Sequence, residues 1–250
     1  MLFSKPWLAC KCAGIKQDID RMNLASDLDT HGFAIVPNVL DAAGCHAMAS
    51  LLGDASGAGT RGMLRILEVA ALAQRMLADL VRPHLPDKPV PVRGIYFDKR
   101  PETNWLVAWH QDLTLALKEK AEVPGFGPWS VKEGVPHVQP PMKLLQQMLT
   151  VRLHLDDTDA DNGALRVLSG THRLGRLSAE AIQNCRETHE EVLCEAKASD
   201  VLLMRPLLLH ASSRSSSARR RRVLHIEFAG FPLPEPLEWH EAPCQSVISP

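Results

Sequence analysis

The residues His110-Gln111-Asp112 combine the side-chain types of a metal site at close spacing. Side chains alternate between the two faces of a β-strand, so a strand over residues 106–115 would place His110 and Asp112 on the same face. An imidazole nitrogen beside a carboxylate oxygen provides two ligands of the two-histidine, one-carboxylate site that holds Fe(II) in non-heme oxygenases. The same spacing also fits an ordinary surface histidine and aspartate, so a metal site requires a second histidine from elsewhere in the chain.

A second histidine in suitable surroundings lies within residues 200–225. There an apolar strand is predicted to end at His210, and a serine-rich turn and four arginines at 219–222 lead into the next strand. A histidine at the end of one strand and an arginine at the start of the next can face the same cavity. The guanidinium would then be a planar, two-pronged anchor for a carboxylate.

These motifs resemble, in type and in order, those of the phytanoyl-CoA dioxygenase family of Fe(II)- and 2-oxoglutarate-dependent oxygenases. The resemblance extends from about residue 24 to residue 229. It is carried by His110-Gln111-Asp112, by DNGALRVLSGTH at residues 161–172, and by His210-Ala211-Ser212 followed by Arg221. The chain departs from the family pattern at Ser169 and Thr171, which replace Pro and Ser, and at Ser215, which replaces Asn. None of these departures changes a residue of the metal motif.

The resemblance implies that His110, Asp112 and His210 bind Fe(II). It also implies that Arg221 binds the distal carboxylate of 2-oxoglutarate, with Ser212 as a hydrogen-bonding companion, because the family's offset from the distal histidine selects this arginine. The implied reaction consumes O2 and releases succinate and CO2. Since the carboxylate ligand is present, the implied outcome is hydroxylation or a related oxidation of a small molecule, and not halogenation.

Alternation along the strand that begins near Arg221 predicts which neighbours share its face. Val223 and His225 should lie on the face of Arg221, and Arg222 should point the other way. The remaining histidines are expected to have ordinary surface, core or structural roles: His137, His154, His172 and His225.

Three further residues are candidates for contact with the substrate: Arg93, Arg152 and Trp129. Arg93 and Arg152 lie on predicted strands, where either could hold an anionic group of the substrate or could form a surface salt bridge. Trp129 belongs to a long segment, residues 116–147, that contains several prolines and glycines. A loop of this length in a compact domain is usually functional, so we expect this segment to be a lid over the cavity mouth.

The elements that must position these residues are mainly strands. We expect helices near residues 24–30, 41–52 and 66–81, followed by strands at 90–97, 106–115, 149–155, 165–168, 201–204, 207–210 and 223–229, with one further strand at 33–36. Such an order predicts a mainly β (α+β) antiparallel sandwich or barrel with helices on one side. The resemblance specifies it as a double-stranded β-helix, a cupin-like jelly roll with N-terminal buttressing helices. We expect residues 24–250 to form this one domain and residues 1–23 to be a loose N-terminal extension.

Composition narrows the list of partners. The 250 residues carry a formal net charge of -1, which removes the electrostatic case for nucleic acid or a membrane surface and argues against the arginine run as a nucleic-acid patch. No apolar run reaches the roughly 18 to 20 residues that span a bilayer. Six scattered cysteines without a secretory signal fit reduced thiols in a cytoplasmic protein, which we expect to be a monomer or a small homo-oligomer.

Two other functions remain compatible with the sequence. A catalytically silent cupin-like protein would keep the barrel and bind a ligand or a metal without turnover. A zinc hydrolase could use the same three ligands, but it would not need Arg221 and would not need oxygen.

Overall fold

Helices surround one short strand in the N-terminal part of the protein. The structure is a computed structural model and describes residues 21–55, 57 and 59–241. Helix α1 (Arg21–Thr30) is followed by strand β1 (Phe33–Val36) and helix α2 (Ala42–Leu52), where the Asp41 carboxylate accepts a hydrogen bond from the Gly44 amide. These elements were predicted from the sequence. Residues 1–20, most of the expected N-terminal extension, lie outside the described residues, and residues 21–23 begin α1.

The predicted helix at 66–81 forms with one irregularity. It consists of α3 (Leu67–Leu72), a π-helical stretch (Ala73–Leu77) and α4 (Ala78–Val81), with single 3₁₀ turns at Met63–Arg65 before it and Arg82–His84 after it. No helix in residues 21–55, 57 and 59–241 combines the length and apolarity needed to cross a membrane.

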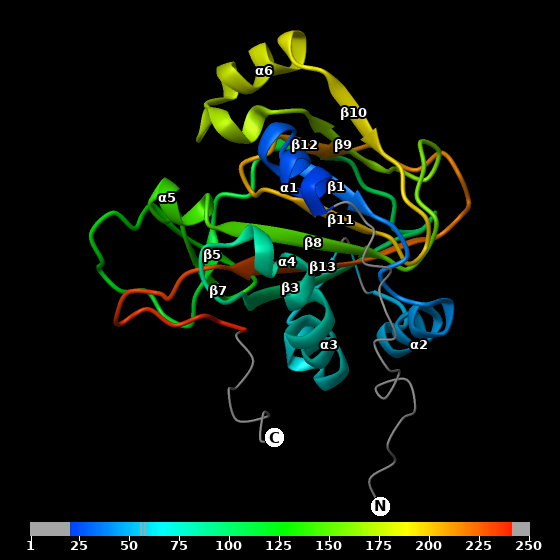
Figure 1. The fold of residues 1–250 in the computed structure, drawn as a ribbon, viewed down its shortest axis with the longest axis horizontal. Helices are drawn as coiled ribbons and strands as arrows, with labels where there is room; N and C mark the ends of the chain where they lie inside the picture. Colours follow the sequence, from blue (N-terminus) through cyan, green and yellow to red (C-terminus); the bar gives the residue numbers. More distant parts are fainter. Residues whose placement is uncertain (1–20, 56, 58, 242–250) are drawn as a thin grey trace, which may run out of the picture.

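Two antiparallel sheets form the body of the protein (Figure 1). The larger sheet has the strand order β1, β11 (Val201–Met204), β8 (Met148–His154), β13 (Arg221–Ala229), β3 (Val90–Lys99) and β2 (Thr60–Arg61). The smaller sheet has the order β10 (Glu191–Cys194), β9 (Leu165–Leu168), β12 (His210–Ser212) and β4 (Val107–His110). This architecture is the expected double-stranded β-helix.

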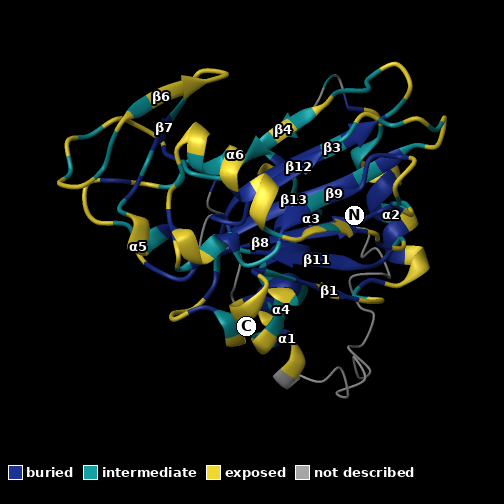
Figure 2. Cartoon of the chain, turned by 90° about the horizontal axis from the view of Figure 1, so that it is seen from above, coloured by how far each residue is buried: buried dark blue, intermediate teal, exposed yellow. Residues whose placement is uncertain are grey.

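The two faces of the larger sheet have different chemistry, as strand β8 shows. Val151 and Leu153 belong to the main apolar core together with residues of α1, α2, α3 and α4, so the helices cover the outer face of the sheet. Thr150, Arg152 and His154 alternate with them and are buried on the inner face, toward the smaller sheet. In Figure 2 strands β8 and β11 of the larger sheet are buried along their whole length.

Some element boundaries differ from the prediction. The strand expected at 106–115 ends at His110, and the strand expected at 207–210 begins only at His210, after a turn in which the Leu208 amide donates to Arg205 O. Helix α6 (Ala179–Thr188) and strand β10 were not predicted.

The expected lid segment, residues 116–147, is more ordered than a loop. It contains β6 (Trp129–Lys132), β7 (Val135–Val138) and the short helix α5 (Met142–Leu145). Strands β5 (Leu115–Ala116), β7 and β6 form a third small sheet. Most of β6 is exposed (Figure 2).

Candidate metal centre

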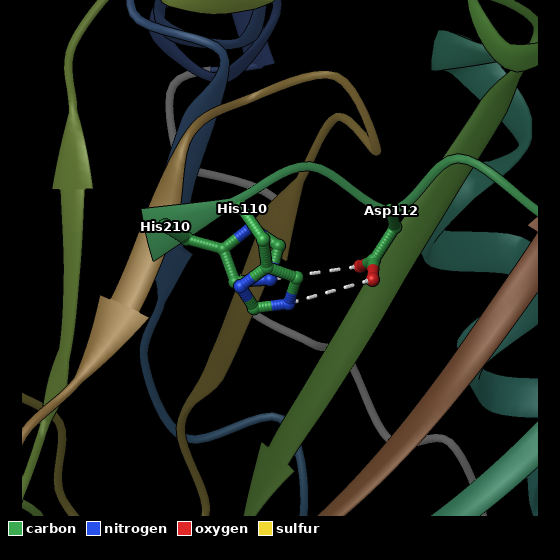
Figure 3. Close-up of side chains that lie close together, drawn as sticks. All are labelled: His110, Asp112 and His210. Carbon is green, nitrogen blue, oxygen red and sulfur yellow. Dashed lines mark ion pairs between the residues drawn. The ribbon is translucent and has the colours of Figure 1, made fainter. Parts of the chain in front are cut away.

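His110 and His210 face each other across the smaller sheet. They are register partners on β4 and β12, and their ring centroids lie 4.1 Å apart. The carboxylate of Asp112 lies beside both rings, with Oδ1 3.9 Å from His110 Nε2 and Oδ2 3.7 Å from His210 Nε2 (Figure 3). One ligand atom from each residue lies within 4.8 Å of the other two. The structure therefore brings the three predicted metal ligands together.

Hydrogen bonds to the backbone orient both imidazoles for metal binding. Nδ1 of His110 lies 2.8 Å from Ala108 O, and Nδ1 of His210 lies 2.9 Å from Leu208 O. A carbonyl oxygen only accepts, so each Nδ1 carries the proton and each Nε2 keeps its lone pair toward Asp112. The Asp112 Oδ2 atom is buried and has no hydrogen-bond partner among the described residues. These three acceptor atoms fit a bound cation.

The protonation states also suit a metal. Burial acts to raise the pKa of Asp112, but the surrounding imidazoles, His210 foremost, and Arg93 hold it at about 2. Burial lowers the pKa of His210 to about 4, although Asp112 acts in the opposite direction. At neutral pH the carboxylate is therefore ionised and the imidazole of His210 is neutral, as metal ligands must be.

Asp112 is held by a loop and not by the strand that the sequence predicts. Its amide donates to Pro206 O at 2.9 Å. The preceding side chain, Gln111, is buried and donates to Gly175 O and Leu207 O, each at 2.7 Å, while its Oε1 accepts from the Leu177 amide at 2.9 Å. The face shared by His110 and Asp112 thus comes from an anchored loop, which corrects the argument from strand alternation.

A cavity of about 320 Å³ opens between the two sheets at the metal ligands. All but one of the residues predicted to form the site line it: His110, Asp112, His210, Ser212, Arg221, Arg93 and Arg152. Trp129 is not among the described residues that line the cavity. It is half-buried opposite Val138 on β7 and packs on a separate apolar cluster, so the structure does not bring it to the substrate cavity.

Arg221 enters the cavity with no acidic partner among the described residues. It is 3% exposed, its Nη1 donates to Gly163 O, and its Nε is buried without a partner. Burial, and then the charge of Arg152, lowers its pKa to about 9. Ser212 Oγ donates to the same carbonyl of Gly163 at 3.0 Å, so these two predicted residues are held at one turn. An unneutralised buried guanidinium is a site for an anion.

The other three arginines of the run point away from the cavity, as alternation predicts for Arg222. Arg219 pairs with Asp159, Arg220 with Asp98, and Arg222 with Asp156, each at 2.7 Å or less. Each of these three charges is therefore matched by a carboxylate.

The sequence interpretation missed two polar groups beside Arg221. Lys99 is fully buried opposite Arg221 on β3, and its Nζ donates to Ser212 Oγ at 3.1 Å and to Ser213 O at 2.6 Å. Burial, with the charges of Arg221 and Arg152, lowers the pKa of Lys99 to about 7. His225, expected to have an ordinary role, lines the cavity on the face of Arg221. Alternation had already placed His225 on this face, whereas only the strand register reveals Lys99.

Comparison with known proteins identifies the family. The model of the phytanoyl-CoA dioxygenase (PhyH) family matches residues 52–223. A search of curated proteins found no match. AviO1 from Streptomyces viridochromogenes Tue57 is similar in structure, with a TM-score of 0.62 at 21% identity over 86% of this chain and 98% of AviO1.

Two other solved structures share the fold. SnoK, a non-heme alpha ketoglutarate dependent carbocyclase from nogalamycin biosynthesis, gives a TM-score of 0.60 at 15% identity over 83% of each chain. HygX from Streptomyces hygroscopicus, solved with nickel and 2-oxoglutarate bound, gives 0.58 at 16% identity over 83% of this chain and 86% of HygX. Because the family match spans well over half of the chain and includes both histidines of the metal centre, this chain belongs to the phytanoyl-CoA dioxygenase family, whose cofactors are Fe(II) and 2-oxoglutarate.

Proposed function

We propose that the protein is an Fe(II)- and 2-oxoglutarate-dependent dioxygenase that hydroxylates a small molecule, with release of succinate and CO2. The observation that carries this proposal is the pairing of two features in one cavity. Three metal-ligand atoms converge at His110, Asp112 and His210, and an unneutralised guanidinium, Arg221, lines the same cavity.

Each residue has a defined part in this function. His110, Asp112 and His210 would hold Fe(II) on one side of the cavity. Arg221 would bind the distal carboxylate of 2-oxoglutarate and so fix its orientation toward the metal. Ser212 would join it by turning its single hydroxyl proton from Gly163 O to that carboxylate. When bound, Fe(II) and 2-oxoglutarate supply the oxidising chemistry with O2. The surrounding sheets would orient the substrate and shield the buried side of the site, at His210, from bulk water.

The decisive experiment is anaerobic. Fe(II) and then 2-oxoglutarate are added to the metal-free protein, and the visible metal-to-ligand charge-transfer band of the chelate is recorded. The wild type and a control, His189→Ala at the end of α6, should give the band, and His210→Ala should not. Iron binding without the band would favour the silent cupin-like protein, and hydrolytic turnover with zinc and without oxygen would favour the hydrolase.

We also propose that residues 116–147 act as a lid. Lys132 on β6 lines the cavity, and the next residue, Glu133, forms an ion pair with Arg61 at the cavity mouth. In Glu133→Ala, hydrogen exchange of residues 129–138 should rise while the melting temperature stays nearly constant, because an exposed pair contributes at most about 1 kcal/mol. Glu238→Ala, which breaks the exposed pair with Lys118, is the control. Unchanged exchange in Glu133→Ala would make the segment a static part of the fold.

A reducing compartment such as the cytoplasm is the proposed location. Cys45, Cys185 and Cys194 are buried free thiols. Titration of denatured, freshly isolated protein with a thiol reagent should find these cysteines reduced, and a disulfide to any of them would contradict the proposal.

A further inference from the structure

Once 2-oxoglutarate is assigned to Arg221, one buried arginine of the cavity is left without a carboxylate partner among the described residues. Of the arginines beside the metal centre, Arg93 already has a partner, because its Nη1 lies 3.1 Å from Glu227 Oε1. Arg221 is assigned above to 2-oxoglutarate. Arg152 is 6% exposed and has no carboxylate within ion-pair distance among the described residues.

The immediate surroundings of Arg152 leave its charge intact. Its Nη1 lies 3.0 Å from Nδ1 of His225, its guanidinium lies 5.4 Å from the ring centroid of Phe97, and its Nε is buried without a hydrogen-bond partner. A guanidinium can only donate, so Nδ1 of His225 accepts this hydrogen bond. The Nε2 atom of His225 lies 3.5 Å from Glu227 Oε1 and has no hydrogen-bond partner among the described residues.

Arg93, Glu227, His225 and Arg152 therefore form one buried chain across β3, β13 and β8. Its one carboxylate, Glu227, forms its ion pair with Arg93. Arg152, at the other end of the chain, is fixed by His225 but is not neutralised by it. A buried charge without a counter-charge is costly, and it is retained where a ligand supplies the counter-charge.

Arg152 is well placed to position a molecule at the metal. It lines the cavity that contains the metal ligands. Ile95, Phe97 and Leu165 provide apolar surface in the same cavity. The volume of about 320 Å³ limits the part of the substrate that enters the cavity to a small group.

We propose that Arg152, oriented by His225, binds a carboxylate or phosphate group of the substrate, so that the substrate is a small anion with an apolar part. This inference rests on the proposed function, because it assumes that 2-oxoglutarate occupies Arg221. It also selects Arg152 over Arg93, which the sequence left as equal candidates.

The test measures anion binding by calorimetry on anaerobic protein loaded with Fe(II) and 2-oxoglutarate. The probes are butyrate, inorganic phosphate and the uncharged butyramide. Butyrate or phosphate should bind and butyramide should not, and the better anion identifies the group. Affinity should fall at least about tenfold in Arg152→Gln and recover in part in Arg152→Lys, which keeps the charge without the two-pronged geometry. Arg166→Gln, outside the cavity on β9, is the control.

Three results would overturn the inference. The first is no binding of either anion at millimolar concentration, and the second is equal binding to the wild type and Arg152→Gln. The third is a loss of 2-oxoglutarate affinity in Arg152→Gln as large as in Arg221→Gln, which would assign Arg152 to the cosubstrate. If the wild type gives no charge-transfer band, the proposed function is refuted and not this inference. Calorimetry with the same anions on metal-free protein then reports whether anion binding depends on Arg152.

Discussion

Ser212 Oγ and Arg221 Nη1 donate to the same acceptor, the carbonyl oxygen of Gly163. Ser212 is at the end of β12 in the smaller sheet, and Arg221 begins β13 in the larger sheet, so this one carbonyl joins the two sheets at the candidate 2-oxoglutarate site. The metal ligands and the anion anchor are thus fixed relative to each other through the backbone of a turn.

Loss of a metal ligand should abolish iron binding. In His110→Ala or Asp112→Ala, two ligand atoms remain, and Fe(II) affinity should fall more than about 100-fold because the chelate is incomplete. Metal analysis after dialysis against Fe(II) under anaerobic conditions measures this, with succinate formation as a second readout. Normal iron content and turnover in either variant would refute the ligand set.

Removal of the Arg221 charge should affect 2-oxoglutarate and not iron. Arg221→Gln should raise the apparent KM for 2-oxoglutarate by about 10- to 100-fold, since a charge-assisted hydrogen bond contributes roughly 1.5–3 kcal/mol. Fe(II) affinity should stay within about twofold. Arg222→Gln is a matched control, because this neighbour points to Asp156 on the opposite face. An unchanged KM in Arg221→Gln would move the anchor to another residue.

A side chain at Gly163 should damage both stability and 2-oxoglutarate binding. The residue has φ +79°, and an added Cβ would lie 2.6 Å from Ser213 O and 3.0 Å from Lys99 Nζ. Gly163→Ala should lower the free energy of unfolding by about 2 kcal/mol or more and weaken 2-oxoglutarate, because the shared carbonyl must move. Gly134 has φ +80°, and an added Cβ there would meet no atom within 4 Å. Gly134→Ala therefore measures the cost of the positive φ alone, without the steric contacts present at Gly163. Equal effects of the two substitutions would show that the Gly163 contacts are unimportant.

Gln111 should be essential for the loop that carries Asp112. Its side chain satisfies two buried carbonyls and the partly buried Leu177 amide, so Gln111→Leu should lower the free energy of unfolding by roughly 2–4 kcal/mol and weaken iron binding. Chemical denaturation and iron titration measure the two effects. The exposed Gln146→Leu should change stability by less than about 0.5 kcal/mol. Iron affinity equal to that of the wild type would show that Asp112 is held in place by other contacts.

Acid should destabilise the protein through His154. Burial, and then the charges of Arg152 and Arg221, lowers the pKa of this imidazole from 6.5 to about 3. The imidazole therefore binds a proton more readily in the unfolded chain than in the folded protein. The contribution of neutral His154 to the free energy of unfolding is thus complete above pH 6.5 and declines as the pH falls toward 3. His154→Gln should reduce the slope of unfolding free energy against pH in this window, measured by urea denaturation. The exposed His46→Gln should keep the slope of the wild type, and a wild-type slope in His154→Gln would contradict the assignment.

The sequence predicted the site better than it predicted the contacts within it. The family's offset from the distal histidine selected Arg221, and alternation along the strand was then sufficient to place Arg222 on the opposite face. The ion pair between Arg93 and Glu227 depends on how β3 and β13 align, and a register shift follows Glu227. Alternation within one strand contains no information about that alignment, so Arg93 and Arg152 could not be distinguished.

The same limit explains Lys99 and Asp112. A lysine in a strand is usually exposed, and only its place opposite Arg221 reveals that Lys99 is buried. Asp112 was predicted on the correct side for an incorrect reason, because the strand ends at His110 and hydrogen bonds to distant loops hold the carboxylate. Such long-range contacts leave no periodic signal in the sequence.

The three metal ligands differ greatly in their access to water. The side chain of His110 is 40% exposed and that of Asp112 is 29% exposed, whereas that of His210 is 5% exposed. Water can therefore compete for a metal ion at His110 and Asp112 more readily than at His210. Solvent would therefore reach a bound ion from the side of His110 and Asp112, while His210 would hold the ion from the buried side of the site.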